Sequence, residues 1–576
     1  MSIKEETISE ILTEWLKSVF REQFGDDLDC SAVNAVETAN AQFGDYQCNA
    51  AMALAKVLKT APRAIAEKVV ERASAHAAVE RTEIAGPGFI NIYLSDKWLI
   101  ERLGVIEGDP KLGVPQIGEG HTVIMDYSSP NVAKPMHIGH IRSTIIGNAL
   151  DRMHRFLGFN VIADNHIGDW GTQFGIIIMG YRHFLDKDAL DTNPVEELER
   201  VYVKSYEKSR EDEEWLNQCR RELVKLQSGD EENTRLWREF IELSMREFER
   251  IYKRLGVSFD IVRGESFYND RLADTVKLLE ERGLAEESEG AIVVFLEEEK
   301  LPVCIVRKSD GGFNYATTDI ATVASRIEDF NPDKIIYVTD ERQQLHFKQF
   351  FTICRKLGYD VDLKHVWFGL MRLPEGTFST RQGNVIKLED FLNEAERRAF
   401  EMVSLSSPQM PENERREVAR AVGIGAVKYA DLSQNPQTMI TFTWDKALAL
   451  DGNSGPYLQY ACARIASVSD KYRERFPDGR LEDAELRFTE PVERELALKL
   501  VRLPDVLIRA TAGYKPSAIA DYLYDLAQCY SRFYQNVPFL KAEEGIRESR
   551  VRLCGITAAV LRCGLGLLGI ETPERI

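Results

Sequence analysis

A buried strand, a short polar break and a long amphipathic helix follow one another early in the chain, and this order constrains the fold more than any other feature. Residues 122–127 (TVIMDY) are typical of a buried strand, and residues 128–131 (SSPN) interrupt it. From His140 onward apolar residues recur at helical spacing until Gly158, a residue type that often follows a helix C-terminus. Residues 160–167 (NVIADNHI) then have the pattern of a second strand. The segment is therefore predicted to be the first βαβ unit of a nucleotide-binding sheet.

The four residues from His137 to His140 (HIGH) lie where this helix is expected to begin. A helix N-terminus offers unpaired N–H groups and a partial positive charge, so phosphates bind there. Gly139 would let a flat adenine ring approach the backbone, and His137 and His140 can donate hydrogen bonds to phosphate oxygens. Donors that are already in place stabilise charge as it develops on an α-phosphate. The alternative, two polar residues there by chance, is disfavoured by the strand–loop–helix setting.

Composition narrows the class of protein. A length of 576 residues suggests two to four domains, and 44% hydrophobic with 29% charged residues is typical of soluble globular proteins. No apolar run is long enough to span a membrane, and the N-terminus lacks the pattern of a secretory signal. Nine scattered cysteines without a C-x-x-C pair argue against disulfides and a thiolate zinc site. We therefore expect a cytoplasmic protein with no membrane partner, no zinc and no organic cofactor.

The charge of the chain is unevenly distributed. The net charge of −19 taken alone argues against a nucleic-acid partner. Residues 453–576, however, hold 18 Lys and Arg against 17 Asp and Glu, so the rest of the chain carries a charge of −20. A near-neutral C-terminal part can still present one basic face to RNA.

The hydrophobic pattern divides the chain into four parts. Residues 1–110 are predicted to form a small α+β unit with helices at 8–20, 51–58 and 64–73 and two strands joined by a Gly-Pro-Gly turn within 79–94. A Gly- and Pro-rich linker precedes an α/β domain at 120–400, which contains a charged helical insertion at about 185–262. A second half of its sheet is expected from strands at 334–339 and 365–371 and a helix at 343–357. Residues 401–452 are predicted to be a helical connecting segment, and residues 453–576 a helical bundle.

Four further segments join the HIGH sequence at the carboxyl ends of predicted strands, where open α/β sheets bind ligands. They are DYSSPN (126–131), GDWGTQFG (168–175), YATTD (315–319) and FSTRQG (378–383), and the helical part adds GPYLQYACARI (455–465). With these segments the whole chain resembles the class I aminoacyl-tRNA synthetases, and more closely the bacterial arginyl-tRNA synthetases. The expected fold is a Rossmann-like parallel-sheet catalytic domain with an insertion, an N-terminal α+β domain and a C-terminal all-α bundle.

The resemblance implies a reaction and a set of partners. L-Arginine and ATP with Mg²⁺ would give arginyl-adenylate and pyrophosphate, and the arginyl group would pass to the terminal adenosine of tRNA(Arg). Members of the family typically need bound tRNA before they activate the amino acid, and they use no covalent enzyme nucleophile. By the same resemblance, residues 1–110 would contact the tRNA elbow, residues 453–576 would bind the anticodon, and the protein would be a monomer.

A guanidinium group favours carboxylates in bidentate geometry, and Asp319 and Glu265 are the candidate carboxylates, with Tyr315 stacking or hydrogen bonding beside them. Loss of a buried charge partner costs about 3–5 kcal/mol, enough to reject uncharged amino acids. Alone, Asp319 could instead cap the helix that follows it. The resemblance assigns the remaining amino-acid contacts to Ser129, Asn131 and Gln343, with His166, Asp169 and Trp170 as possible pocket walls; Trp170 could equally be a core residue.

The second phosphate-binding signature departs from the class pattern. Class I enzymes usually carry a KMSKS loop whose lysines hold the ATP phosphates, whereas the matching residues here include Ser379, Thr380 and Arg381, with one cation. The family commonly has a lysine just before the first signature, and Lys134 occupies that place. We expect Lys134 and Arg381 together to replace the missing lysine charge; a solvated loop lysine is the alternative.

Two groups of residues are candidates for tRNA contacts. Tyr457, Tyr460 and Arg464 can share a helix face, and aromatics beside a cation suit unstacked anticodon bases. Phe89 and Asn91 share one face of a predicted strand, in the region that meets the tRNA elbow in the family. Packing inside the bundle or the sheet is the alternative for both groups.

Three other functions remain open from the sequence. A different class I synthetase, of glutaminyl or cysteinyl type, would share the signatures, although the missing zinc set and the carboxylate pair speak against it. A non-catalytic tRNA-binding relative would not need the phosphate-binding residues Lys134, His137, Gly139 and His140, which are all present. A small nucleotidyltransferase would share the HIGH loop but would usually lack two large flanking domains.

Overall fold

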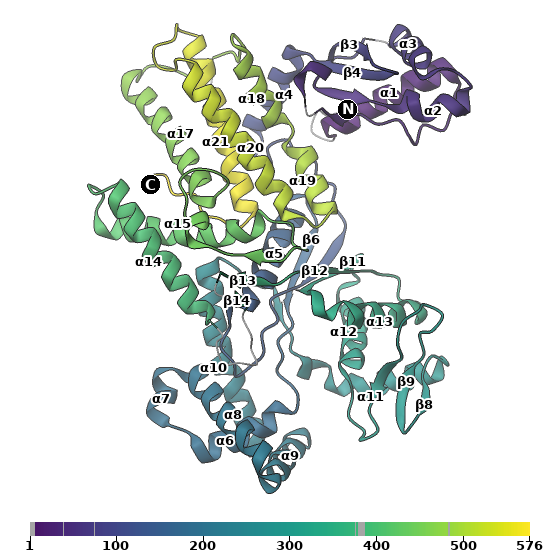
Figure 1. The fold of residues 1–576 in the computed structure, drawn as a ribbon, viewed down its shortest axis with the longest axis vertical. Helices are drawn as coiled ribbons and strands as arrows, with labels where there is room; N and C mark the ends of the chain where they lie inside the picture. The colour runs from purple at the N-terminus through teal and green to yellow at the C-terminus, as the bar shows by residue number, and fades with distance from the viewer. Residues whose placement is uncertain (1–5, 39, 74, 375, 378–385, 482–483) are drawn as a thin grey trace.

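A parallel sheet lies at the centre of the computed structural model, and the other parts of the chain surround it (Figure 1). The structure describes residues 6–38, 40–73, 75–374, 376–377, 386–481 and 484–576. The N-terminal part lies beside the C-terminal helices at one end of the molecule, and the inserted helices project from the other end. The predicted α/β architecture with flanking α+β and all-α parts is confirmed.

The central sheet has five parallel strands in the order β12-β11-β5-β6-β7. Its first half runs from β5 through β6 to β7, and its second half starts on the other side of β5. The order therefore reverses between β5 and β11, which is where open α/β sheets form a ligand crevice. The strands are β5 (Thr122–Asp126), β6 (Asn160–Asn165), β7 (Ile261–Val262), β11 (Lys334–Asp340) and β12 (Asp362–Phe368).

The predicted first βαβ unit is confirmed, with helix α5 (Ile138–Phe156) between β5 and β6. The helix buries the apolar stripe that its sequence showed, including Ile141, Ile145 and Met153. Gly158 follows the helix end with a φ of 92°, a conformation that glycine adopts without strain. Because α5 follows β5, its N-terminus lies at the point where the strand order reverses.

The N-terminal part is an antiparallel sheet in the order β1-β2-β4-β3 covered by helices. Both strands predicted within residues 79–94 are present. The helix predicted at 8–20 continues to Phe24, the other two begin one or two residues earlier than predicted, and a fourth helix, Asp96–Gly108, was not predicted. Two short strands in the first half, which lack an alternating pattern, were not predicted. The elements are α1 (Ile8–Phe24), β1 (Val36–Glu37), β2 (Tyr46–Cys48), α2 (Ala50–Leu58), α3 (Pro62–Arg72), β3 (Val79–Ala85), β4 (Phe89–Leu94) and α4 (Asp96–Gly108).

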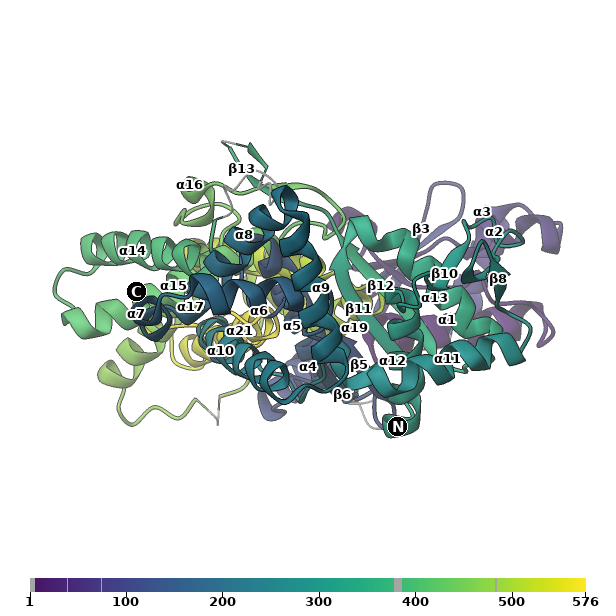
Figure 2. The same ribbon diagram turned by 90° about the horizontal axis from the view of Figure 1, so that it is seen from below.

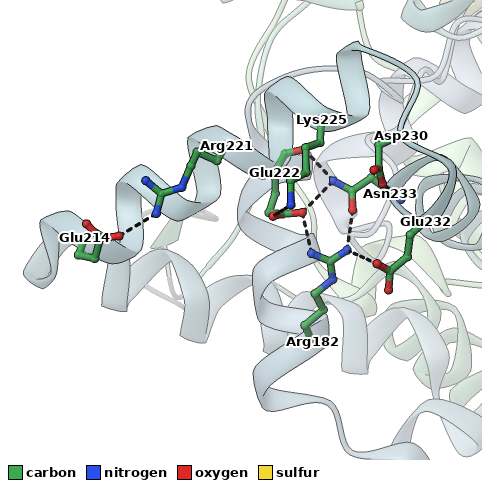
Figure 3. A network of polar contacts seen from close by, with 8 residues as sticks. All are labelled: Arg182, Glu214, Arg221, Glu222, Lys225, Asp230, Glu232 and Asn233. Atoms are coloured by element: carbon green, nitrogen blue, oxygen red, sulfur yellow. Dashed lines mark hydrogen bonds and ion pairs between the residues drawn. The ribbon is translucent and has the colours of Figure 1, made fainter.

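The insertion is a group of helices joined by a polar network around Arg182 (Figure 3). Arg182 pairs with Glu222 at 2.6 Å and with Glu232 at 3.0 Å, and the amide of Asn233 donates to Glu222 at 2.9 Å. One guanidinium thus connects three helices. The helices are α6 (Gln173–Phe184), α7 (Lys187–Thr192), α8 (Pro194–Glu211), α9 (Glu213–Gln227) and α10 (Glu231–Leu255).

The second half of the α/β domain differs from the prediction in two places. The predicted strand at 365–371 is wrong at its end: β12 stops at Phe368, and Met371 begins β13 of another sheet. Gly369 lies between the two strands. A side chain would not fit at this position, because a Cβ there would lie 2.7 Å from the carbonyl oxygen of Thr438. An antiparallel sheet, β10-β9-β8, was not predicted. The elements are η2 (Glu265–Tyr268), α11 (Asn269–Glu281), β8 (Glu286–Ser288), β9 (Ala291–Val294), β10 (Cys304–Arg307), α12 (Tyr315–Phe330), η3 (Glu341–Gln343), α13 (Gln344–Lys356), β13 (Met371–Leu373) and β14 (Gly376–Thr377).

The C-terminal part is helical apart from β15 (Ile440–Thr441), which pairs with β13. Lys428 joins it to α10, because its ammonium donates to the carbonyl oxygen of Leu255 as well as to that of Gly569 near the C-terminus. Asp505 joins it to the N-terminal part by accepting the backbone N–H groups of Ile8 and Ser9, each at 3.2 Å. The helices are α14 (Leu388–Ser406), α15 (Glu412–Leu432), α16 (Trp444–Ala447), α17 (Gly455–Arg475), α18 (Pro491–Val501), α19 (Leu503–Ala512), α20 (Pro516–Asn536) and α21 (Ile546–Leu567).

Seen from below, the insertion stands in front of α5 (Figure 2). It contacts the loop that follows β5, where the hydroxyl of Ser244 on α10 accepts the backbone N–H of Ala133 at 2.9 Å. The insertion therefore borders the crevice at the carboxyl end of the sheet. Within the described ranges, none of the helices has the length and apolar character that a membrane crossing requires.

Candidate active site

Helix α5 begins with a reciprocal cap made by its two histidines. The Nδ1 atom of His137 accepts the backbone N–H of Gly139 at 3.0 Å, and the Nδ1 atom of His140 accepts the backbone N–H of His137 at 3.1 Å. The two ring centroids lie 3.9 Å apart. Because each Nδ1 atom accepts a hydrogen bond, each neutral ring carries its proton on Nε2. The cap thus fixes both tautomers and leaves two Nε2–H donors for a ligand.

Both histidines stay neutral at pH 7. Burial, together with the proximity of His137, lowers the pKa of His140 to about 3. Burial also lowers the pKa of His137, together with the positive charges of Lys134 and Arg342. Two neutral donors at a helix N-terminus can stabilise a phosphate oxygen without changing their protonation state.

Gly139 is required by the cap itself. A Cβ at this position would lie 2.7 Å from Cε1 and 2.8 Å from Nδ1 of His137, which is closer than real contacts of this kind. A larger residue would therefore displace the ring that caps the helix. The sequence suggested a close approach of adenine as the reason for this glycine, and the structure supplies a reason within the chain.

The loop between β5 and α5 is held in an unusual conformation. Ser128, Ser129 and Ala133 all have positive φ, at 74°, 49° and 61°, a region that residues with a side chain adopt at a cost in strain. The hydroxyl of Ser128 lies 2.8 Å from those of both Thr144 and Tyr252, and the N–H of Ser129 donates to Asn165 at 3.1 Å. The surrounding elements therefore hold the loop in a single conformation, and strain of this kind is concentrated at functional sites.

Three carboxylates from separate elements lie together across the crevice. Burial, together with the negative charges of Asp319 and Asp169, raises the pKa of Glu265 to about 8. Within the described part of the chain, Glu265 forms no ion pair. Tyr315, at the start of α12, is 69% exposed, and partial burial of its hydroxyl together with the charge of Glu265 raises the pKa of that hydroxyl. The structure therefore brings the two predicted carboxylates together with Tyr315, in a place that favours a cationic ligand.

Two of the three carboxylates, Asp319 and Asp169, have a hydrogen-bond partner that positions them. Asp319 accepts a hydrogen bond from Nε2 of His346 at 2.5 Å. It lies inside α12, whose N-cap is Asn314, so the alternative that Asp319 caps this helix is wrong. Asp169 accepts the backbone N–H and the hydroxyl of Ser266 at 2.8 and 2.6 Å. His346 and Ser266 were not singled out from the sequence, because nothing in their local pattern marks a functional role.

The remaining predicted amino-acid contacts lie at the ends of neighbouring strands. Ser129 donates its hydroxyl to Asp126 at 3.2 Å, and Asn131 forms a parallel bridge with Gly168 after β6. Gln343 is exposed at the end of η3, which follows β11. Ser129 and Asn131 follow β5 and Gln343 follows β11, so the three residues lie at the carboxyl ends of two adjacent strands.

The predicted pocket-wall residues line its β6 side. His166 packs on the ring of Tyr268, with 5.6 Å between centroids, and its buried Nδ1 has no hydrogen-bond partner among the described residues. Trp170 is half-buried and meets Trp237 edge-on at 5.8 Å. The indole N–H of Trp237 donates to the carbonyl oxygen of Asp169 at 2.8 Å. Trp170 thus contributes to packing while one side of it stays open.

A buried ionic group below the site was missed by sequence reasoning. Arg326 is fully buried and pairs with Asp126 at 2.6 Å and with Asp164 at 2.7 Å. Asp126 and Asp164 stand opposite each other at the ends of β5 and β6. Two aspartates at the ends of neighbouring predicted strands could have indicated a shared cation. The identity of that cation could not be predicted, because Arg326 lies far away in the sequence. The group fixes these two strand ends relative to α12.

The predicted second phosphate-binding residues, Ser379, Thr380 and Arg381, lie outside the described residues. The chain that follows them is described and runs antiparallel to the HIGH segment. The N–H of Ile138 donates to the carbonyl oxygen of Ile386 at 3.1 Å, and the N–H of Leu388 donates to that of Met136 at 2.9 Å. Lys134, before the HIGH segment, lies with its ammonium 5.0 Å from the ring centroid of Tyr202 on α8.

Of the three predicted tRNA-binding residues on α17, Tyr460 is exposed, and Tyr457 and Arg464 are half-buried. Tyr460 is 40% exposed, and the guanidinium of Arg464 lies 4.9 Å from its ring centroid and 5.5 Å from that of Tyr534 on α20. Tyr457 instead packs between helices and contacts Ser531 and Gln528 through its hydroxyl. Tyr534, 37% exposed, was missed because α20 comes much later in the chain.

The predicted pair on β4 lies on the outer face of the N-terminal sheet. Phe89 is half-buried, whereas Asn91 is only 2% exposed, and its side-chain oxygen accepts the amide of Gln47 at 2.7 Å. Asn91 therefore orients Gln47, which lies opposite it on β2 and is itself half-buried. On this face of the sheet, the side-chain amide that reaches solvent is therefore that of Gln47 and not that of Asn91.

Three family models together match nearly the whole chain. Residues 6–94 match the arginyl tRNA synthetase N-terminal domain, residues 105–444 match the catalytic domain of class I (R) tRNA synthetases, and residues 458–576 match the DALR anticodon-binding domain.

Individual proteins give the same result. The chain is 46% identical to an arginine–tRNA ligase from Fusobacterium nucleatum subsp. nucleatum over 100% of both chains. It is 45% identical to one from Chromobacterium violaceum, covering 92% of this chain and 94% of the other. The crystal structure of arginyl-tRNA synthetase from Plasmodium falciparum superposes with a TM-score of 0.84 at 28% identity, covering 99% of this chain and 100% of that one.

Proposed function

Because the chain belongs to the arginyl-tRNA synthetase family, we propose that the α5 N-terminus binds the phosphates of ATP and that the carboxylates across the crevice bind the guanidinium of arginine. The chain is an arginine–tRNA ligase that uses ATP to join L-arginine to tRNA through an arginyl-adenylate. The observation that carries the assignment of the site is the group formed by Glu265, Asp319 and Asp169 at the crevice where α5 begins.

The ATP half of the site consists of residues around the helix cap. The Nε2–H groups of His137 and His140 donate to phosphate oxygens, and Gly139 keeps the cap and the adenine side open. Lys134 supplies a positive charge from the loop before the cap. Ser379, Thr380 and Arg381 complete this half, and Mg²⁺ enters with ATP as part of the substrate.

The arginine half uses acidic residues at one end and amides and a hydroxyl at the other. Asp319 and Glu265 hold the guanidinium, Tyr315 covers it, and Asp169 adds negative charge. Ser129 and Asn131 hold the α-amino end, and Gln343 holds the carboxylate end. His166 and Trp170 form the wall on the side of β6.

The chemistry then needs positioning rather than an enzyme nucleophile. A carboxylate oxygen of arginine attacks the α-phosphorus of ATP, the bond to the β-phosphate oxygen breaks, and pyrophosphate leaves. The two fixed Nε2–H donors and Lys134 stabilise the charge on the phosphate oxygens during this step. A hydroxyl of the terminal adenosine of tRNA next attacks the arginyl carbonyl carbon, and AMP leaves.

The flanking parts provide the tRNA contacts. Tyr460, Arg464 and Tyr534 form a platform on which anticodon bases stack, while Tyr457 supports it from within the bundle. In the N-terminal part, Phe89 and the amide of Gln47, held by Asn91, contact the tRNA elbow. The protein acts as a monomer in the cytoplasm.

Charging of purified tRNA with each of the twenty amino acids tests this proposal. Arginine alone is expected to be joined to tRNA, and the Asp319→Asn variant is expected to lose most of the activity while it keeps its affinity for ATP. Asp329→Asn, on the same helix but paired with Arg263, is the matched control. Charging of another amino acid, or full activity of Asp319→Asn, would overturn the assignment.

A further inference from the structure

Lys387 is fixed beside the capped end of α5 by its own backbone. It is the antiparallel bridge partner of His137, and the hydrogen bonds on either side join Ile138 to Ile386 and Leu388 to Met136. The Cα atoms of such partners lie about 5 Å apart. The long, flexible stem of a lysine that starts here can place its ammonium at the same helix N-terminus that the histidines cap.

The side chain of Lys387 is held by the insertion. Its ammonium pairs with Glu196 on α8 at 3.0 Å, and both side chains are partly exposed. Glu199, one turn further along α8, also lies near it: burial raises the pKa of Glu199, and the charges of Lys387 and Lys134 oppose that rise. Tyr202, one more turn along, lies under the ammonium of Lys134 at 5.0 Å.

These three residues of α8 form one continuous face, because positions three apart on a helix are neighbours. We call Glu196, Glu199 and Tyr202 the α8 face. It contacts Lys134, two residues before the paired segment 136–138, and Lys387, the middle residue of the paired segment 386–388. The insertion thus contacts two cations that lie beside the α5 N-terminus.

A partly exposed pair of this kind is easily exchanged. Solvent screens the attraction between Lys387 and Glu196, and holding two long side chains together costs entropy. A triphosphate carries several negative charges and stays close to the helix N-terminus, so it competes well for the ammonium. In a site where the second signature retains few cations, one more lysine at this position would matter for ATP binding.

On the basis of the proposed function, we propose that Lys387 is a further ATP-phosphate-binding residue and that Glu196 on α8 holds its ammonium away from the phosphates until ATP displaces it. The insertion and the phosphate site are then coupled: binding of the triphosphate releases α8, and a tightly held α8 weakens ATP binding. Lys387 binds substrate in this scheme, whereas Glu196 acts through Lys387 and is a positioning residue.

The two partners are expected to have opposite effects on the KM for ATP in tRNA-dependent pyrophosphate exchange. Lys387→Ala should raise this KM about tenfold or more, because a charge-assisted contact is lost. Lys387→Arg should recover most of the loss, and the KM for arginine should stay unchanged. Glu196→Gln should lower the KM for ATP by up to about fivefold, the range of an exposed ion pair. In the Lys387→Ala background, Glu196→Gln should have no effect.

Lys356 and Glu299 form a comparable partly exposed pair at 2.7 Å away from the crevice, and Lys356→Ala should leave the KM for ATP unchanged. Thermal melting of each variant shows whether it is folded. If both single substitutions change the KM for ATP in the same direction, or neither changes it, the pair is only a surface contact and the proposal is overturned. Wild-type protein that charges no arginine would overturn the proposed function instead, so the two failures are distinguishable.

Discussion

Arg142 on α5 and Asp431 on α15 form an ion pair from which solvent is excluded. Nε of Arg142 lies 3.0 Å from one carboxylate oxygen and Nη2 lies 3.1 Å from the other, and both side chains are at most 2% exposed. The guanidinium also donates to the carbonyl oxygens of Gly369 and Thr438. Arg142 follows His140 by two residues, so this pair ties the capped end of the catalytic helix to the C-terminal part.

Removal of one partner of this pair should destabilise the protein strongly. Asp431→Asn or Arg142→Met leaves a buried charge without its counter-charge, which costs about 3–5 kcal/mol of folding free energy. Thermal melting is expected to show a large drop in Tm for each single variant. The double variant Arg142→Met/Asp431→Leu should recover part of the loss, because it leaves no buried charge unpaired. As a control, Glu412→Gln breaks the exposed pair with Arg416 and should change the Tm little.

Lys134 should contribute to the chemical step more than to folding. Lys134→Ala is expected to slow adenylate formation by about 10²-fold or more, on the scale of one preorganised donor. Single-turnover formation of pyrophosphate in the presence of tRNA measures this rate. Lys364→Ala is the matched control, because that lysine also lies over a tyrosine ring, 5.4 Å from Tyr514, but outside the crevice. An unchanged rate for Lys134→Ala would remove this residue from the site.

The parts of the site that follow from local pattern could be predicted from the sequence. A buried strand, a break and an amphipathic stripe define β5 and α5 almost to the residue, because burial fixes the period of both elements. The HIGH segment then falls at the helix N-terminus by geometry alone. The short strands of the β8–β10 sheet carry too few residues to show a period, and the end of β12 depends on a distant contact at Gly369.

Contacts between distant segments could not be predicted in the same way. The partners of Asp319, Asp126 and Lys387 are His346, Arg326 and Glu196, and each lies on another element. No local pattern marks such a residue, since its role depends on the tertiary arrangement. Asn91 shows the converse case, because the family resemblance suggested a tRNA contact whereas the fold buries it against Gln47.

The tRNA platform on the C-terminal helices gives a prediction for binding. Tyr534→Ala and Tyr460→Ala should each raise the KM for tRNA about tenfold, since stacking of a base on an aromatic ring contributes about 1–3 kcal/mol. The arginine and ATP KM values should stay unchanged. Tyr457→Phe is the control, because that ring packs between helices and only its hydroxyl contacts are lost. Equal effects of Tyr457→Phe and Tyr534→Ala would argue that all three act through packing.

The raised pKa of Glu265 makes arginine binding depend on pH in a defined direction. Its folded-state pKa of about 8 means that the carboxyl is mostly protonated at pH 7 in the free enzyme. A bound guanidinium favours the ionised form, so arginine binding at pH 7 should release up to about one proton. The KM for arginine should therefore fall as the pH rises from 6 to 8 and then level off. Calorimetry in two buffers of different ionisation enthalpy measures the released proton directly.

The same group should lower stability as the pH rises. An unfolded glutamate loses its proton near pH 4.5, whereas Glu265 in the folded protein keeps it up to about pH 8, so the folded state binds more protons across this window. Its contribution to stability is complete below pH 4.5 and is lost as the pH rises through 8. Glu265→Gln should flatten both the decline of Tm between pH 5 and 8 and the change in arginine KM. A KM for arginine that stays constant from pH 6 to 8 in the wild-type protein would show that Glu265 does not face the guanidinium.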